Sequence, residues 1–207
     1  MSDAPLDPCD DEDPPWIVAV CPLTPELAAQ IASMAELDWS EDALAEQAML
    51  AAGWRTGEDL LGDLEEKACT PAGHLVYGDD CFAMPFAYEY YVHPDGAIGE
   101  DYWGAQPGWH SLIDPPEGTF DAQLQAVVDT FTALLGPPDV DVTHERRPGL
   151  DYTWRYRAWR RGGNILVVAS GLDGFSYAQF EHAFVQIRSL PPGTPLPPAR
   201  ELPDFFW

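Results

Sequence analysis

The segment from residue 152 to residue 170 constrains the fold more than any other part of the chain. Aromatic residues alternate with polar ones over 152–157, which is the two-residue period of a strand with one apolar face. Two glycines and an asparagine at 162–164 are typical of a tight turn. The unbroken apolar run at 165–169 is typical of an interior strand. The sequence therefore predicts an antiparallel hairpin here.

A second strong pattern predicts a long amphipathic helix that begins at Asp121. Apolar residues recur at helical spacing from Leu124 to Leu135, and Gly136 with the two prolines behind it ends the pattern. The segment Val140–His144 is predicted as a strand. A helix with one apolar face of this length is expected to cover the sheet.

Two shorter helices are expected before this region. The first begins at Pro25 with Thr24 as its cap, and the second follows Ser40 and stops at Gly53. Because Trp54 follows that glycine directly, we expect its ring to plug one end of the helix pair.

The other segments carry weaker patterns. Residues 16–20 are predicted as a short strand, and the β-rich runs between 72 and 92, punctuated by Pro85, predict a small antiparallel meander. Residues 93–118 are rich in Gly, Pro and Trp without periodicity, so a long loop is expected. Over 176–188 a helix is favoured over a strand, because four large apolar residues share one helical face.

These elements predict a single α+β domain over residues 16–190. Its expected architecture is an N-terminal helix pair, an antiparallel sheet with the long central helix packed on it, and a C-terminal strand hairpin. A chain of 207 residues suits one buried core. Residues 1–15 are predicted to form a disordered acidic tail, and 191–207 a Pro-rich C-terminal extension whose terminal aromatic residues, 205–207, pack back on the body.

The charge of the chain is extreme and uneven. There are 35 acidic residues against 10 Lys plus Arg, a formal net charge of -25. Residues 1–145 carry a formal charge of -28 and residues 146–207 carry +3. Such a field repels nucleic acid and anionic lipid and speeds encounter with basic proteins, so neither nucleic acid nor membrane is expected as a partner. The alternative is that the acidity only maintains solubility.

A cytoplasmic location is expected from two observations. The apolar runs are far shorter than the roughly 20 residues that cross a bilayer, and the chain does not open with a charged and then apolar leader. The four cysteines have wide spacings without a CxxC pair, which indicates neither a zinc site nor a dense disulfide framework. We expect no metal and no cofactor.

Common enzyme motifs do not occur in the sequence. It lacks a glycine-rich phosphate loop, a GxSxG elbow, an HExxH motif and an EF-hand loop, so a non-catalytic protein with no catalytic residues is predicted. An enzyme built from scattered residues is the alternative. The best such cluster, as a metal site or an acid–base pair, comprises His74, Asp79, Asp80, Cys81 and His93. Ordinary turn chemistry is the favoured explanation of these residues.

The only basic cluster lies in the last third of the chain. It comprises Arg146, Arg147, Arg155, Arg157, Arg160 and Arg161. Without a glycine loop, phosphate binding is disfavoured, and we expect these arginines to pair with carboxylates of the same chain or to contact a partner.

Acidic and aromatic residues together favour a protein-binding surface. Tyr and Trp supply contact area at low entropic cost, and carboxylates steer a cationic partner. The predicted partner-binding residues are Asp10, Asp11, Glu12, Asp13, Asp79, Asp80, Glu100, Asp101, Tyr102 and Trp103. As an alternative, Tyr102 and Trp103 seal the core beneath a loop.

Several short segments recur in an order that resembles a family. They are ELDW at 36–39, AAGW at 51–54, LLGPPD at 134–139, YTWRYR at 152–157 and ILVV at 165–168. This order resembles small, uncharacterised actinobacterial proteins that are often encoded beside secreted polymorphic toxins and look like their immunity partners. The resemblance implies binding and inhibition of a toxin in the cytosol of its producer.

The resulting hypothesis is a non-catalytic acidic binding protein, an immunity protein that binds and inhibits a basic cognate toxin. The first alternative is a scaffold or chaperone for a basic exported protein, which would bind without inhibiting an activity. The second alternative is the enzyme with a site formed by scattered residues.

Overall fold

A computed structural model describes residues 15–39, 42–56, 66–77, 82–92, 101–144, 154–173, 180–196, 198 and 201. Within these residues the fold combines three helices with a large antiparallel sheet, and the sheet dominates. The elements are β1 (Trp16–Val20), α1 (Pro25–Met34), α2 (Asp42–Ala51), β2 (Arg55–Thr56), β3 (Glu66–Cys69), β4 (Leu75–Tyr77), β5 (Phe82–Tyr91), β6 (His110–Ile113), α3 (Thr119–Leu135), β7 (Val140–His144), β8 (Trp154–Arg161), β9 (Asn164–Leu172) and β10 (Glu181–Ser189).

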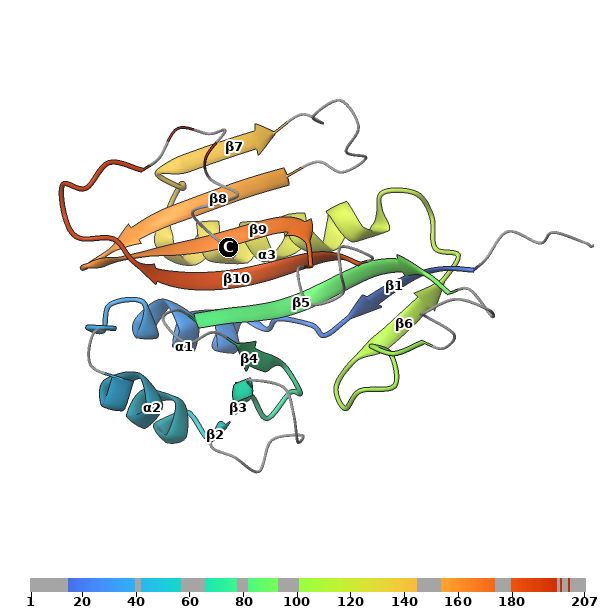
Figure 1. Ribbon diagram of the computed structural model, residues 1–207, viewed down its shortest axis with the longest axis horizontal. Helices are drawn as coiled ribbons and strands as arrows, with labels where there is room; N and C mark the ends of the chain where they lie inside the picture. The colour runs from blue at the N-terminus through green and yellow to red at the C-terminus, as the bar shows by residue number, and fades with distance from the viewer. Residues whose placement is uncertain are drawn as a thin grey trace, which may run out of the picture.

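The long strand β5 organises the sheet. The main path runs β2-β3-β4-β5-β10-β9-β8-β7, and β1 joins it by pairing with β5 on one side and β6 on the other (Figure 1). Strand β4 meets β5 near its start, at Ala83, whereas β1 pairs with residues 87–91 near its end. Because β10 occupies the opposite edge of β5, strands β4 and β1 share one edge in succession. Strands β1 and β6 therefore form a separate lobe at one end of the sheet.

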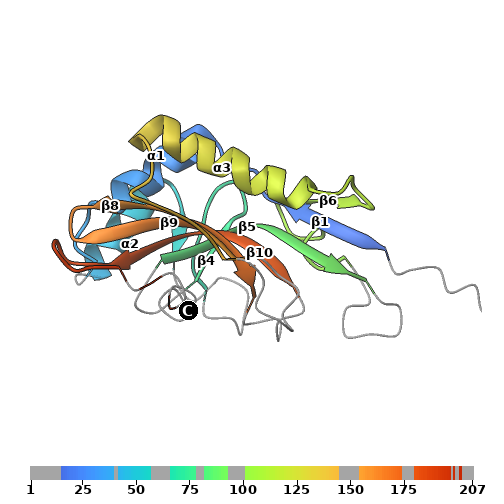
Figure 2. The same cartoon turned by 90° about the horizontal axis from the view of Figure 1, so that it is seen from above.

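Two helices cover one face of the sheet. Helices α1 and α3 lie side by side above it, as Figure 2 shows. Their buried faces, which include Ile31 from α1 and Phe131 from α3, pack with Val168 and Val185 of the central strands in the largest apolar cluster. The expected role of a long helix with one apolar face is met by α3, which begins two residues before Asp121.

Side-chain hydrogen bonds satisfy backbone groups at both ends of α1. The Thr24 hydroxyl accepts the backbone N–H of Leu27 at 3.2 Å, as predicted for the cap of α1. At the other end, Asn164 Nδ2 donates to the carbonyls of Ala35 and Leu37 at 2.8 and 2.7 Å. Since the last carbonyls of a helix have no partner within it, this asparagine ties α1 to the β8–β9 turn.

Tryptophans make comparable links between helices and sheet. Trp159 Nε1 donates to the carbonyl of Gly136 at the end of α3, at 2.9 Å. Trp54 is buried, and its Nε1 donates to Gln30 Oε1 of α1 at 3.1 Å, so this ring joins the segment after α2 to α1. Each ring fills apolar space while its N–H finds an acceptor.

From residue 154 on, where the structure describes it, the hairpin predicted at 152–170 is present as β8 and β9, joined at Gly162 and Gly163, with every residue of 164–171 buried. It is not the C-terminal end of the sheet, because β10 follows it in the chain and inserts between β9 and β5. The hairpin therefore lies toward the β7 side, and the last strand is central.

The prediction of a helix over 176–188 is wrong where the structure describes it. Residues 181–189 form strand β10, which pairs with β5 and β9. Residues 182–187 are buried on both faces of the sheet, so the alternation that marks a half-exposed strand is missing. Phe180, Phe184 and Ile187 do recur at helical spacing, but residues 182–187 are all buried, so this spacing does not distinguish a helix from a strand.

Two further expectations need correction. Residues 110–113 do not belong to a loop but form β6, which pairs with β1. Pro85 does not interrupt the meander, because β5 runs continuously from residue 82 to residue 91. The register against β10 shifts between Ala183 and Phe184, opposite this proline, and such a bulge accommodates a residue without an N–H.

No helix among the described residues has both the length and the apolar character needed to cross a bilayer. Residues 1–14 and 202–207, where the acidic tail and the terminal aromatic residues were expected, lie outside the described residues.

Candidate functional site

Three of the predicted partner-binding residues, Asp101, Tyr102 and Trp103, lie in a turn beside the β1–β6 lobe. The remaining seven fall outside the described residues: Asp10, Asp11, Glu12, Asp13, Asp79, Asp80 and Glu100. The structure therefore locates one part of the predicted surface.

The carboxylate of Asp101 holds its own turn together. Its Oδ1 accepts the hydroxyl of Tyr90 at 2.6 Å and the backbone N–H of Gly104 at 2.9 Å. Partial burial raises the pKa of Asp101, but hydrogen bonds from Ser111, Tyr90 and Gly104 outweigh that effect and leave the pKa lowered. Asp101 is thus ionised and engaged within the chain.

Trp103 is buried in an aromatic cluster on the sheet face opposite α1 and α3. Its ring stacks on Tyr88 with centroids 4.0 Å apart and planes 9° apart. The rings of Trp109, Phe180 and His182 also contact Tyr88. A buried ring offers little surface to a partner, so Trp103 seals the core beneath the turn, which was the alternative expectation.

Close backbone contact fixes this turn to the rest of the domain. Gly73 and Gly108 both have positive φ angles, and a Cβ on either would meet a backbone carbonyl oxygen of the facing turn at 1.9 or 1.7 Å. Trp109 Nε1 also donates to the Gly73 carbonyl at 3.3 Å. Only glycine permits this approach, so residues 101–109 are held rigidly against the β3–β4 turn.

Tyr102 differs from its neighbours because 48% of its surface is exposed. The turn that carries it lies against β6, since a Cβ on Gly104 would touch the hydroxyl of Ser111. Nearby, Tyr91, Leu112 and Ile113 are 55%, 37% and 67% exposed. We call Tyr91, Tyr102, Leu112 and Ile113 the sheet-end surface.

The sheet-end surface contains four of the seven large apolar side chains that are exposed in the described part of the chain. Leu112 and Ile113 are consecutive in β6, and exposed apolar groups that occur together mark interaction sites more often than scattered ones do. Sequence reasoning missed Leu112 and Ile113 because it assigned them to a loop. The four-residue run HSLI between Trp109 and Asp114 was the available signal.

The arginines of β8 interact with groups of the same chain, which was one of the two expectations; the other was contact with a partner. Arg155 binds both carboxylate oxygens of Asp121 on α3, at 2.7 and 2.9 Å. Arg157 pairs with Asp141 at 2.9 Å. Arg161 pairs with Glu36, also at 2.9 Å. Arg146 and Arg147 lie outside the described residues.

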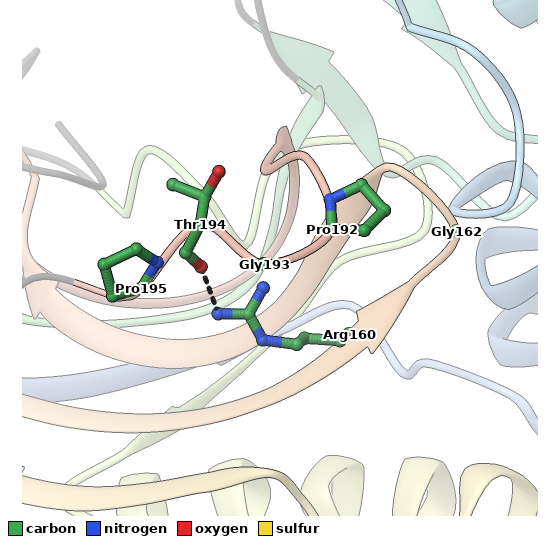
Figure 3. A pocket seen from close by; sticks show the side chains of 6 residues that line it. All are labelled: Arg160, Gly162, Pro192, Gly193, Thr194 and Pro195. Carbon is green, nitrogen blue, oxygen red and sulfur yellow. Dashed lines mark hydrogen bonds between the residues drawn. The ribbon is translucent and has the colours of Figure 1, made fainter.

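Arg160 lines a cavity between the β8–β9 turn and the segment after β10. Its Nη2 donates to the carbonyl of Thr194 at 2.6 Å (Figure 3). The cavity has a volume of about 510 Å³ and is lined by Arg160, Gly162, Pro192, Gly193, Thr194 and Pro195. This hydrogen bond from Arg160, the only charged residue in the lining, ties the proline-rich segment to β8.

His74, the first member of the alternative catalytic cluster, has a structural role. Its buried ring donates from Nε2 to the Cys21 carbonyl at 3.0 Å, and Nδ1 accepts the Thr70 hydroxyl at 3.2 Å. Burial lowers the pKa of His74 to about 4, and the hydrogen bond to Cys21 only partly opposes this, so the ring is neutral at pH 7. The other members lie outside the described residues: Asp79, Asp80, Cys81 and His93.

A carboxyl pair lies beneath the start of α3. Glu89 of β5 and Glu181 of β10 face each other across the sheet and share a hydrogen bond. Burial, the bond to Glu89 and the charges of Glu89 and Asp121 raise the pKa of Glu181 to about 8, and Arg155 opposes them. The pKa of Glu89 is also raised, chiefly by burial. The pair therefore holds one proton at neutral pH.

The remaining polar features lie on β10 and around α3. His182 Nδ1 lies 3.9 Å from Asp173 Oδ1, both side chains are buried, and burial lowers the pKa of His182 to about 3. A crevice of about 230 Å³ is lined by Asp121 and Arg155, whose charged groups pair with each other. Within the described residues, no group of three or more His, Cys, Asp or Glu side chains has the arrangement of a metal site.

Comparison of the chain with protein-family models, with curated proteins and with solved structures finds no match.

Proposed function

We propose that this protein is a non-catalytic acidic binding protein that binds and inhibits a basic toxin, as an immunity protein does. One observation carries the proposal. The net charge of -25 already counts the arginines of β8, and each of them is bound to a carboxylate or a carbonyl of its own chain, so a large excess of acids remains. The negative field remains available to a partner.

The distribution of charge and apolar surface supports the same proposal. Between Lys67 and Arg146 the chain contains no Lys or Arg, and the sheet-end surface lies within or beside this stretch. Long-range attraction would bring a basic protein to this region, and exposed apolar groups would then supply contact area once it arrives. The resemblance to toxin immunity partners points in the same direction.

The proposal is tested by affinity capture from a lysate of the native organism, on wild-type protein and on a variant with Tyr102→Ala. The matched control is Leu134→Ala, which removes an equally exposed side chain from the far end of α3. The captured basic protein is then expressed in a heterologous host with and without its binder. Arrest of growth by that protein, and rescue by co-expression, supports the proposal.

Two results would count against it. If no basic protein is captured at 0.1 M salt, the result would contradict the proposal that the protein binds a basic partner. Capture of a basic protein that is bound without any loss of its activity would favour the scaffold or chaperone alternative.

A further inference from the structure

Strand β6 has a free edge within the described part of the chain. It pairs with β1 on one side, and no described strand pairs with its other side. The N–H of Asp114 donates to the Trp16 carbonyl at 2.7 Å, which places this pair in the hydrogen-bonded register. Because antiparallel registers alternate, the backbone groups of Leu112 point to β1, whereas those of Ser111 and Ile113 point to the open edge.

Apolar side chains flank this edge on both faces. Leu112 lies opposite Val18, which belongs to the core beneath α1 and α3, and Ile113 lies opposite Ile17, which belongs to the aromatic cluster on the other face. Both Leu112 and Ile113 are exposed, so a strand laid along β6 would cover apolar surface above and below the sheet. Free backbone groups with flanking apolar side chains are the requirements for strand addition.

The charged residues near β6 indicate what kind of strand would bind to its free edge. The exposed Asp114 and Glu117 follow β6 directly, and the nearest Lys or Arg in the sequence are Lys67 and Arg146. The other edges of the described sheet are less suited to a cation, because β7 lies beside β8 with its arginines, and β2 is two residues long and contains Arg55.

We infer that β6 is the docking edge for an extended cationic segment of the basic partner, which adds a strand to the sheet. This inference rests on the proposed function and assigns the binding site of the basic partner to β6. The segment carries two adjacent apolar side chains, one on each face of the sheet against Leu112 and Ile113, and cationic side chains beside them toward Asp114 and Glu117. A second copy of this chain does not fit, because it would bring the same acids and a charge of -25 to the edge.

The test uses full-length protein and a defined probe, an eight-residue peptide of paired lysines and paired valines (KKVVKKVV) with blocked ends, which presents valine on both faces of a strand. Amide NMR shifts and hydrogen exchange report where it binds. We expect the largest changes at Ser111 and Ile113. Two control peptides are the same sequence with glutamate in place of lysine, and the lysine peptide with alternate backbone nitrogens methylated so that one edge cannot donate. Both controls are expected to lose most of the binding.

Ile113→Pro removes one outward N–H and is expected to weaken the peptide about fivefold, the effect of one net hydrogen bond. Ile113→Lys keeps the backbone donor but places a cation at the edge, and serves if the proline variant does not fold. Leu134→Lys is the control with the same change of charge at a distant exposed site.

The inference is overturned if the amide changes map to β7, if the methylated peptide binds as well as the parent, or if both Ile113 variants bind like wild type. Protection of the Ser111 and Ile113 amides by self-association without peptide would overturn it too. Capture of a basic protein at full strength by both Ile113 variants would reject the edge and leave the proposed function standing. Failure to capture any basic protein would reject the proposed function even if the peptide binds β6.

Discussion

The carboxyl pair of Glu89 and Glu181 should make the free energy of unfolding fall as pH rises, and Glu181→Gln should remove this effect. The folded state holds the shared proton up to about pH 8, whereas an unfolded glutamate releases it near pH 4.5. Between these values the folded state binds one proton more than the unfolded state, so the pair makes stability fall as pH rises.

The magnitude follows from one proton. A full proton corresponds to about 1.4 kcal/mol per pH unit, or about 2 kcal/mol between pH 6.0 and 7.5. Both side chains are only half-buried, and contact with solvent reduces the expected change to about 1 kcal/mol.

The assay is urea unfolding followed by tryptophan fluorescence at pH 6.0, 6.75 and 7.5, for wild type and Glu181→Gln. The amide can still bond to Glu89 but cannot share a proton. His74 and His182 have lowered folded pKa values and contribute a slope of opposite sign, and self-repulsion of the acidic chain contributes as well. These effects are common to both proteins, so the difference between the two slopes isolates the pair.

We expect the stability of Glu181→Gln relative to wild type to increase by about 1 kcal/mol between pH 6.0 and 7.5. The control Glu26→Gln removes an exposed carboxylate from α1 and should leave the pH slope unchanged. Parallel curves for wild type and Glu181→Gln would refute the reasoning.

Three other substitutions test the fold and the candidate site. Gly73→Ala should destabilise the protein by more than about 2 kcal/mol, because its Cβ would lie 1.9 Å from the Pro107 carbonyl oxygen, whereas Gly163→Ala, in open space, should be nearly neutral in urea unfolding. Asn164→Ala should cost about 2 kcal/mol of unfolding free energy, because two carbonyls at the end of α1 lose their donor, and an unchanged midpoint would contradict this. Trp103→Ala should cost about 3–5 kcal/mol in stability as a buried ring, while Tyr102→Ala should leave stability within about 0.5 kcal/mol and weaken partner binding; the reverse pattern would exchange their roles.

Local patterns predicted the elements whose burial is one-sided or whose ends carry strong signals. Helix α3 has an apolar face over its whole length and a glycine at its end, and Thr24 caps α1 through its own side chain. The hairpin of β8 and β9 is read from alternation, a glycine turn and an apolar run. In each case the information lies within about 20 residues of sequence.

The structure differs from the predictions where distant segments decide the outcome. Strand β10 is buried on both faces, so its composition suits a core helix as well as a core strand, and only pairing with β5 and β9 distinguishes them. Strand β6 is four residues long within a Gly- and Pro-rich stretch, and it exists because β1 offers it an edge.

The same limit applies to the candidate site. The burial of Trp103 depends on Tyr88, which a different strand supplies, so the sequence could not separate Trp103 from its exposed neighbour Tyr102. The register of β5 and β10 brings Glu89 and Glu181 together, and no local sequence pattern predicts this pair. The arginines were expected to meet acids of the chain, but the identity of each acid required the structure.

The most direct test of the central claim is a titration of the captured partner's toxic activity with this protein at 0.1 and 0.5 M salt. We predict complete inhibition at one equivalent in low salt, with affinity that weakens as salt screens the acidic surface. An activity that persists at saturating protein, or an affinity that does not change with salt, would contradict the account.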